Sequence, residues 1–233
     1  MKTVPVLEQW TILAAVAGAT GRIGVGTFVT NVMNRHPAVV ARMASTLAAA
    51  SGGRFTLGMG IGGNAAEHAA YGIDFPDKPE RAARLEEAIL TIRALWTGGP
   101  VSRPSPYYPL VGAHAFPMPE PAPRILVGAA SPAGLRIAAR VGDGWAAEID
   151  DFERLLPTYV EALATNGRTR ADAWIAVGFG SGKTGQDALT ASPWVEAPRE
   201  TWARYAAAGA DEAIVTARTP HDVDALVGAA DRW

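Results

Sequence analysis

The feature that most limits the fold of this 233-residue chain is a strict alternation of strand-like and helix-like segments. Short β-branched and apolar runs predict six strands, at residues 22–30, 55–60, 124–128, 143–147, 173–179 and 212–217. Apolar residues at spacings of three and four predict helices, at residues 7–19, 37–50, 65–71, 80–96, 131–141, 150–164, 198–208 and 220–230. Strands that alternate with helices across short links pair in parallel. The pattern therefore predicts an α/β fold, either a doubly wound sheet or a (β/α) barrel.

One segment interrupts the alternation. Residues 98–123 are rich in proline and carry no periodic pattern. A long irregular stretch inside a compact domain usually serves as a lid over a site, and the alternative is a surface decoration with a small hairpin. No other boundary divides the chain, so we expect a single domain over residues 1–233 with an irregular insertion at residues 98–123.

Composition excludes several classes of protein. The net charge is -2 and no stretch concentrates basic residues, which argues against binding to nucleic acid or an anionic membrane. The chain has no cysteine, and its four histidines have no metal-ligand spacing, so we expect no metal site. The start of the chain lacks the apolar core of a signal peptide, and residues 11–19 are too short to cross a bilayer. We expect a cytoplasmic protein that binds a small molecule.

In both candidate folds, ligands bind at the carboxyl ends of the strands, so those ends define the candidate site. The second predicted strand ends in a G-x-G-x-x-G run at residues 58–63, followed by Asn64. A dinucleotide site would need a long helix at once and an acidic residue after the next strand, and both are missing here. The closely spaced glycines still suggest a binding site, because glycines such as Gly60 and Gly62 let a planar ligand approach the backbone.

The third predicted strand leads into a helix through small residues, at Gly128, Ala129, Ala130 and Ser131. Free N–H groups and the helix dipole at such a point attract phosphate. The alternative is an ordinary tight link between strand and helix.

Residues 26–31 (Gly-Thr-Phe-Val-Thr-Asn), followed by Arg-His-Pro at 35–37, resemble the third-strand signature of the bacterial luciferase-like family. Residues 51–60 resemble its fourth-strand signature, and the segments around 81–96 and 123–145 resemble the helix and strands that follow. The resemblance covers essentially the whole chain. It implies a TIM-type (β/α)8 barrel, in which the six visible strands are the family's third to eighth.

Members of the family usually begin with two strands and a helix that this sequence lacks, so we expect a truncated relative. The polar residue that the second strand supplies near the reacting ring has no counterpart here, and the catalytic residue is unknown. The alternatives are a catalytic oxidoreductase, a shortened non-catalytic relative and a fragment of a longer protein. Exposed sheet edges at such a truncation would favour a homodimer.

The cofactor that the resemblance implies is the deazaflavin F420, with FMN and the lack of a competent site as alternatives. F420 enzymes of the family that share the Val-Thr-Asn sequence carry a non-prolyl cis peptide before the valine, which implies a cis Phe28–Val29 bond that forms a bulge behind the central ring. The implied cofactor-binding residues are Thr27, Phe28, Val29, Asn31, Gly60, Gly62, Asn64, Gly128, Ala129, Ala130 and Ser131. Asn64 would bond the ring edge, with a left-handed turn residue as its alternative role. The substrate is an unidentified organic molecule.

Overall fold

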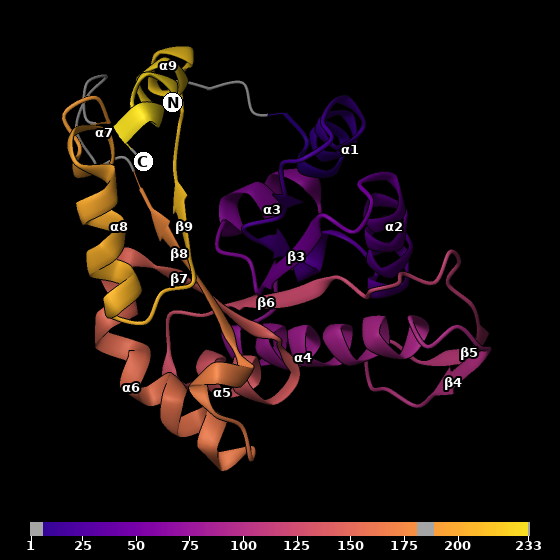
Figure 1. Ribbon diagram of the computed structural model, residues 1–233. Coiled ribbons are helices and arrows are strands. Elements are labelled where there is room, and N and C mark those ends of the chain that lie inside the picture. Colours follow the sequence, from indigo (N-terminus) through magenta and orange to yellow (C-terminus); the bar gives the residue numbers. More distant parts are fainter. Residues whose placement is uncertain (1–6, 181–188, 233) are drawn as a thin grey trace. The chain divides into compact units, whose positions relative to one another are not determined.

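The computed structural model describes residues 7–180 and 189–232 of the chain (Figure 1). Its contacts divide the chain into two compact units. Unit 1 comprises Met1–Gly128 with Arg140–Asp143, and unit 2 comprises Ala129–Ala139 with Gly144–Trp233. Each of the six predicted strand positions carries strand structure, so the predicted alternation is confirmed. The description of residues 1–233 as one domain stays a prediction.

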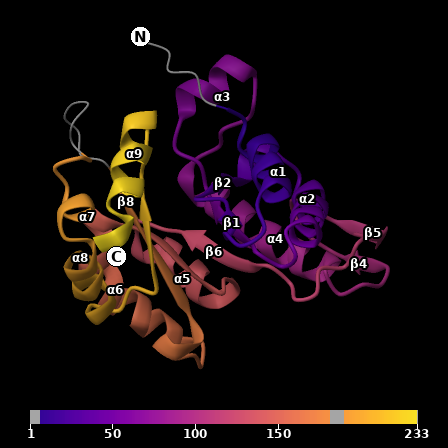
Figure 2. The same cartoon turned by 45° about the horizontal axis from the view of Figure 1, so that its top comes forward.

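Unit 1 is built on parallel strands with helices packed against them (Figure 2). β3 (Phe55–Gly60) is the central strand and pairs in parallel with β1 (Val25–Gly26), β2 (Thr30–Asn31) and β6 (Arg124–Gly128). Three helices bury apolar faces in this unit, α1 (Gln9–Ala19), α2 (Pro37–Ala50) and α4 (Lys78–Leu95). Leu57 and Met59, which point to the same face of β3, are both fully buried.

The predicted strand at residues 22–30 is two short strands with an irregular turn of chain between them. Val25 and Gly26 pair with Phe55 and Thr56, whereas Thr30 and Asn31 pair with Met59 and Gly60. Three residues on one strand therefore face two on its partner, which is a bulge of one residue. The β-branched composition predicted the strand, but it carries no signal for a bulge.

The proline-rich insertion contains an antiparallel hairpin of β4 (Val101–Arg103) and β5 (Leu110–Ala113). Arg103 donates to the Glu87 carboxylate of α4 at 2.8 Å, and the Arg84 guanidinium lies 4.9 Å from the Tyr107 ring centroid. Of the two interpretations of residues 98–123, these contacts favour a decoration attached along α4. A role as a lid stays a prediction.

Unit 2 holds the parallel strands β7 (Gly144–Glu148), β8 (Trp174–Phe179) and β9 (Glu212–Val215). Its core is centred on Trp145, which contacts Phe152 and Tyr159 of α6 (Ile149–Thr165), and all three side chains are fully buried. The other helices are α5 (Pro132–Val141, of which residues 132–139 lie in this unit), α7 (Pro193–Glu196), α8 (Pro198–Ala207) and α9 (Pro220–Gly228). The short α7 was not predicted from the sequence.

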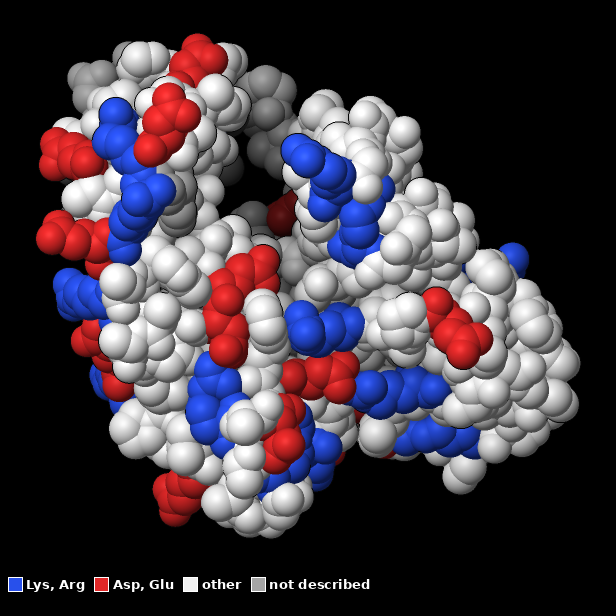
Figure 3. All heavy atoms as spheres, in the orientation of Figure 1, with Lys and Arg blue, Asp and Glu red and all other residues white. Residues whose placement is uncertain are grey.

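Within the described ranges, none of the helices has the length and apolarity to cross a bilayer. Figure 3 shows basic and acidic side chains interspersed on the face drawn. In unit 1 several charged side chains are paired, as in Arg84–Glu80 at 2.7 Å and Arg140–Glu86 at 2.5 Å. Surface pairs of this kind contribute little to stability, but they prevent a field of one sign from building up.

Candidate functional site

The bulge between β1 and β2 is held by the side chain of Thr27. Its hydroxyl donates to the Gly58 carbonyl at 2.7 Å and accepts from the Gly58 N–H at 2.8 Å. A hydroxyl is one of the few groups that can donate and accept at once, so it satisfies both backbone groups of Gly58. Thr27 is buried, and its hydroxyl replaces the ladder hydrogen bonds that the bulge interrupts.

The Phe28–Val29 peptide bond in this bulge is cis, as predicted. The Val29 side chain lies against three glycines. A Cβ on Gly60 would lie 2.7 Å from Val29 Cγ2, one on Gly128 would lie 3.1 Å from it, and one on Gly58 would lie 2.1 Å from the Thr27 carbonyl oxygen. Glycine is therefore needed at these positions because the chain's own bulge fills the space, whereas the sequence had suggested close approach by a ligand.

Asn31, at the end of β2, uses its whole amide inside the protein. Its Oδ1 accepts from the Met33 N–H at 3.0 Å, and its Nδ2 contacts Asn34 Oδ1 at 3.2 Å and His68 Nε2 at 2.9 Å. Gly62 has φ +76°, and a Cβ there would lie 2.5 Å from Asn31 Oδ1. Asn31 and Gly62 are thus packed directly together at the carboxyl ends of β2 and β3.

Asn64 caps the N-terminus of α3 (Ala65–Tyr71). Its Oδ1 accepts from the Glu67 N–H at 3.2 Å, and its Nδ2 donates to the Glu67 carboxylate at 3.3 Å. The φ of Asn64 is −105°, so the alternative of a left-handed turn residue is wrong. The side chain is exposed at the carboxyl end of β3, where the predicted ring edge would lie.

Three residues beneath the loop at 61–64 were not predicted as part of the site. Arg81 of α4 is buried and donates to the carbonyls of Gly62 at 3.1 Å and Ile61 at 3.5 Å. Its guanidinium lies 3.7 Å from the Phe75 ring centroid, and the centroid of the buried His68 ring lies 4.4 Å from that of Phe75. The loop is therefore supported by a cation, an aromatic ring and an imidazole.

A charged side chain usually lies on the polar face of a helix, but Arg81 lies on the buried face of α4. Arg81 precedes Leu85, Ala88 and Ile92 at spacings of four, three and four, so it continues the buried stripe of α4. The spacing was a signal for burial, but the charge of the side chain obscured it. A buried arginine needs acceptors, and here the loop carbonyls of Ile61 and Gly62 accept from its Nη1.

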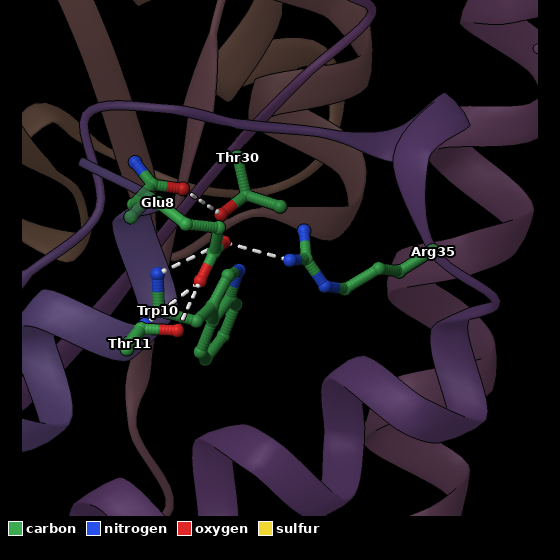
Figure 4. Close-up of polar contacts among 6 residues, drawn as sticks. Glu8, Trp10, Thr11, Thr30 and Arg35 are labelled. Carbon is green, nitrogen blue, oxygen red and sulfur yellow. Dashed lines mark hydrogen bonds and ion pairs between the residues drawn. The ribbon is translucent and has the colours of Figure 1, made fainter. Parts of the chain in front are cut away.

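The start of α1 is tied to β2, where the Thr30 hydroxyl donates to Gln9 Oε1 at 2.8 Å, and to the segment after β2 (Figure 4). Glu8 caps α1 by accepting from the N–H groups of Trp10 and Thr11, and it pairs with Arg35 at 2.7 Å. Burial alone would raise the pKa of Glu8. The hydrogen bonds from Thr11 and Trp10 and the Arg35 charge outweigh it and lower the pKa to about 2.

The predicted phosphate-binding residues, 128–131, lie where the chain passes from unit 1 to unit 2. Ser131 caps α5, since its Oγ accepts from the Gly134 N–H at 3.3 Å. The Ala129 carbonyl accepts from the Trp145 Nε1–H at 2.8 Å, which fixes the loop to the core of unit 2. Ala130 and Ser131 are exposed at the helix N-terminus, as an anion site requires.

The sequence matches the family described as luciferase-like monooxygenase over residues 2–229. The chain belongs to this family. An F420-dependent glucose-6-phosphate dehydrogenase of Beutenbergia cavernae is 39% identical over 174 residues, which cover 72% of this chain and 51% of that protein. A phthiodiolone/phenolphthiodiolone dimycocerosates ketoreductase of Mycobacterium bovis is 36% identical over 217 residues, which cover 85% of this chain and 56% of that protein.

Among solved structures, an F420-dependent secondary alcohol dehydrogenase in complex with an F420–acetone adduct matches with a TM-score of 0.69 and 23% identity. The match covers 75% of this chain and 54% of that one. It confirms the fold as the TIM-barrel type of the luciferase-like family. The chain spans about half the length of the curated relatives it matches.

The predicted site residues thus fall into two groups. We call residues 27–31 and 58–64 the ring segment; unit 1 brings them together at the carboxyl ends of β2 and β3. We call residues 128–131 the phosphate segment; apart from Gly128, it belongs to unit 2. Within the described ranges no cluster of three metal-binding side chains is found.

Proposed function

We propose that this luciferase-like chain carries the cofactor-binding part of an oxidoreductase that transfers a hydride between coenzyme F420 and a small organic substrate. The observation that carries the proposal is the Val29 bulge seated on glycines at the carboxyl ends of β3 and β6. Parallel α/β folds bind ligands at these ends. Two of the three relatives reported above, the glucose-6-phosphate dehydrogenase and the secondary alcohol dehydrogenase, are named as F420-dependent, and this supports deazaflavin over FMN.

The residues fit a flat ring. Phe28 and Val29 are partly exposed between the buried Thr27 and Thr30, so apolar atoms are available at the strand ends. A Cβ on Gly63 would meet no atom within 4 Å, so the loop leaves open space beside Asn64. An aromatic ring that packs on Val29 would remove apolar surface from water, and this stabilises binding.

In this proposal Val29 backs the ring, Asn64 lies at its edge, and the phosphate segment holds the phosphate of the cofactor tail. The deazaflavin supplies the hydride chemistry, as cofactors generally do. The protein contributes binding, orientation and exclusion of water. Thr27, Asn31, Gly60 and Gly62 hold the bulge and loop in place, because their contacts are made within the protein.

Fluorescence titration of the purified chain with F420 tests the proposal, with FMN as the parallel arm. We expect saturable quenching of F420 at micromolar concentrations and weaker binding of FMN. Failure of both to bind would overturn the cofactor-binding role. Binding of FMN alone would assign the chain to flavin chemistry within the family.

Two finer predictions from the sequence belong to the same proposal, a homodimer and a cytoplasmic location. Light scattering coupled to size exclusion would measure the first directly. A mass equal to one chain of 24.4 kDa would contradict it. Fractionation of cells that express the protein would test the second.

A further inference from the structure

His68 joins the two strand ends of the ring segment. Its Nε2 lies 2.9 Å from Asn31 Nδ2, and its Nδ1 lies 2.8 Å from the Asn64 carbonyl oxygen. Asn31 stands at the end of β2, and Asn64 follows β3. Apart from backbone pairing, this imidazole is a direct connection between the bulged strand and the glycine loop.

The partners of His68 determine its tautomer. The Asn64 carbonyl oxygen can only accept, so Nδ1 carries the proton. The Asn31 Nδ2 can only donate, so Nε2 is the acceptor in this contact. The amide orientation of Asn31 is determined in turn, because its Oδ1 accepts from the Met33 N–H and its Nδ2 faces Asn34 Oδ1.

His68 is also the point at which α3 is attached. It is the buried residue of that seven-residue helix, at 2% exposure, and the other side chains from Ala65 to Tyr71 are exposed. The Phe75 ring, 4.4 Å away, packs on the imidazole, and Arg81 covers Phe75 in turn. A helix attached through one histidine depends on that histidine for its position.

We propose that His68 is a positioning residue. It holds Asn31 and Asn64 in register with each other, so that the ring segment is preorganised before any ligand binds. The proposal rests on the proposed function only for its consequence on cofactor affinity. The register itself is a property of the protein alone. Preorganised sites bind more tightly because less ordering is left to the binding step.

Two variants separate the contact of His68 with Asn31 from its contact with Asn64. His68→Gln places an acceptor oxygen near the position of Nε2 and keeps the Asn31 contact. His68→Asn places a donor near Nδ1 and keeps the Asn64 contact. His68→Leu removes both, and His36→Leu is the matched control, because His36 caps α2 through the Ala38 N–H and contacts Tyr108 away from the loop.

Hydrogen exchange of the protein without cofactor is the first measurement. We expect His68→Leu to speed exchange about tenfold in both residues 27–34 and 60–68. His68→Gln should leave the exchange rate of residues 27–34 unchanged, and His68→Asn should leave that of residues 60–68 unchanged. His36→Leu should change neither rate. If His68→Gln and His68→Asn each speed exchange equally in residues 27–34 and 60–68, His68 is only a core residue, and the proposal is overturned.

F420 affinity is the second measurement, on the same variants. We expect about tenfold weaker binding for His68→Leu and little change for His36→Leu. Unchanged affinity in His68→Leu, with the wild type binding F420, would overturn the link between register and binding. If the wild type binds no F420, the proposed function fails, and hydrogen exchange still decides on the bridge.

Discussion

The ring segment and the phosphate segment are built in opposite ways. In the ring segment the polar side chains have partners within the protein, from the Thr27 hydroxyl on Gly58 to the Asn31 amide on His68. In the phosphate segment Ala130 and Ser131 are exposed, and the contact of Ser131 is the cap of its own helix. The first is shaped by tertiary contacts and the second by the local end of a helix. Substitutions in the first should therefore change folding, and those in the second should change binding alone.

The largest effect should come from Gly58→Ala. A Cβ there would lie 2.1 Å from the Thr27 carbonyl oxygen, and backbone cannot move away as a flexible side chain can. We expect a loss of about 3 kcal/mol in the free energy of unfolding, measured with urea. Gly63→Ala is the control, since a Cβ there meets nothing within 4 Å. Equal losses in both variants would contradict the tight fit of the bulge.

Arg81→Met should have the next largest effect. The variant keeps the apolar stem but leaves two loop carbonyls without their donor and removes the cation from Phe75. We expect a loss of about 2 kcal/mol, again from urea unfolding. The matched variant Arg84→Met breaks a half-buried pair with Glu80 and a contact with the Tyr107 ring, and it should cost about 1 kcal/mol. A smaller loss for Arg81→Met than for Arg84→Met would contradict the role of the buried arginine.

In the phosphate segment, Ser131→Asp and Ser131→Asn form a matched pair. Asp and Asn cap helices about equally well, so the unfolding free energies should agree within about 0.5 kcal/mol. The added carboxylate would repel a phosphate at the N-terminus of α5. We expect F420 to bind Ser131→Asp about tenfold more weakly than Ser131→Asn, about 1.4 kcal/mol. Equal F420 affinities of the two variants would contradict phosphate binding by this segment.

The smallest effect concerns Glu8, whose pKa is lowered to about 2 in the folded protein, below its ordinary value of 4.5. A depressed carboxyl pKa adds stability that is present above the unfolded-state value and is lost as pH falls toward the folded-state value. Glu8→Gln should therefore be less stable than the wild type at pH 7 by a few tenths of a kcal/mol, about the value of an exposed cap and ion pair. Urea unfolding at pH 7 and pH 2.5 should show the difference shrinking with acid. A difference in unfolding free energy that is the same at both pH values would contradict the lowered pKa of Glu8.

Much of the fold followed from periodicity, because helices and buried strands bury regular faces. The predicted ranges for α2, β3, α3 and β6 agree with the structure to the residue. Periodicity could not reveal the bulge at residues 27–29, since a one-residue insertion leaves the composition of the strand unchanged. The sequence offered a small hairpin in residues 98–123 as one of two interpretations, but it could not place the hairpin along α4, which depends on single contacts such as Arg103 with Glu87.

The site was predicted less completely than the fold. The family resemblance named both segments and the cis bond, but it assigned Asn31 and Gly62 to a ligand that the protein's own atoms leave little room for. His68 and Arg81 were missed because their roles are relations between distant residues. Such relations appear in a sequence only as an unexpected charge or imidazole on a buried stripe.

The packing of Val29 against three glycines has a consequence for the exchange of segments between related proteins. The bulge, Gly58, Gly60 and Gly128 fill one another's space across three strands that are far apart in the sequence. A transplant of residues 27–31 into another barrel would carry its function only if the glycines of the two neighbouring strands travelled with it. The bulge, the glycines of β3 and Gly128 must therefore be exchanged together, and a recombination library should place its crossovers outside these three segments.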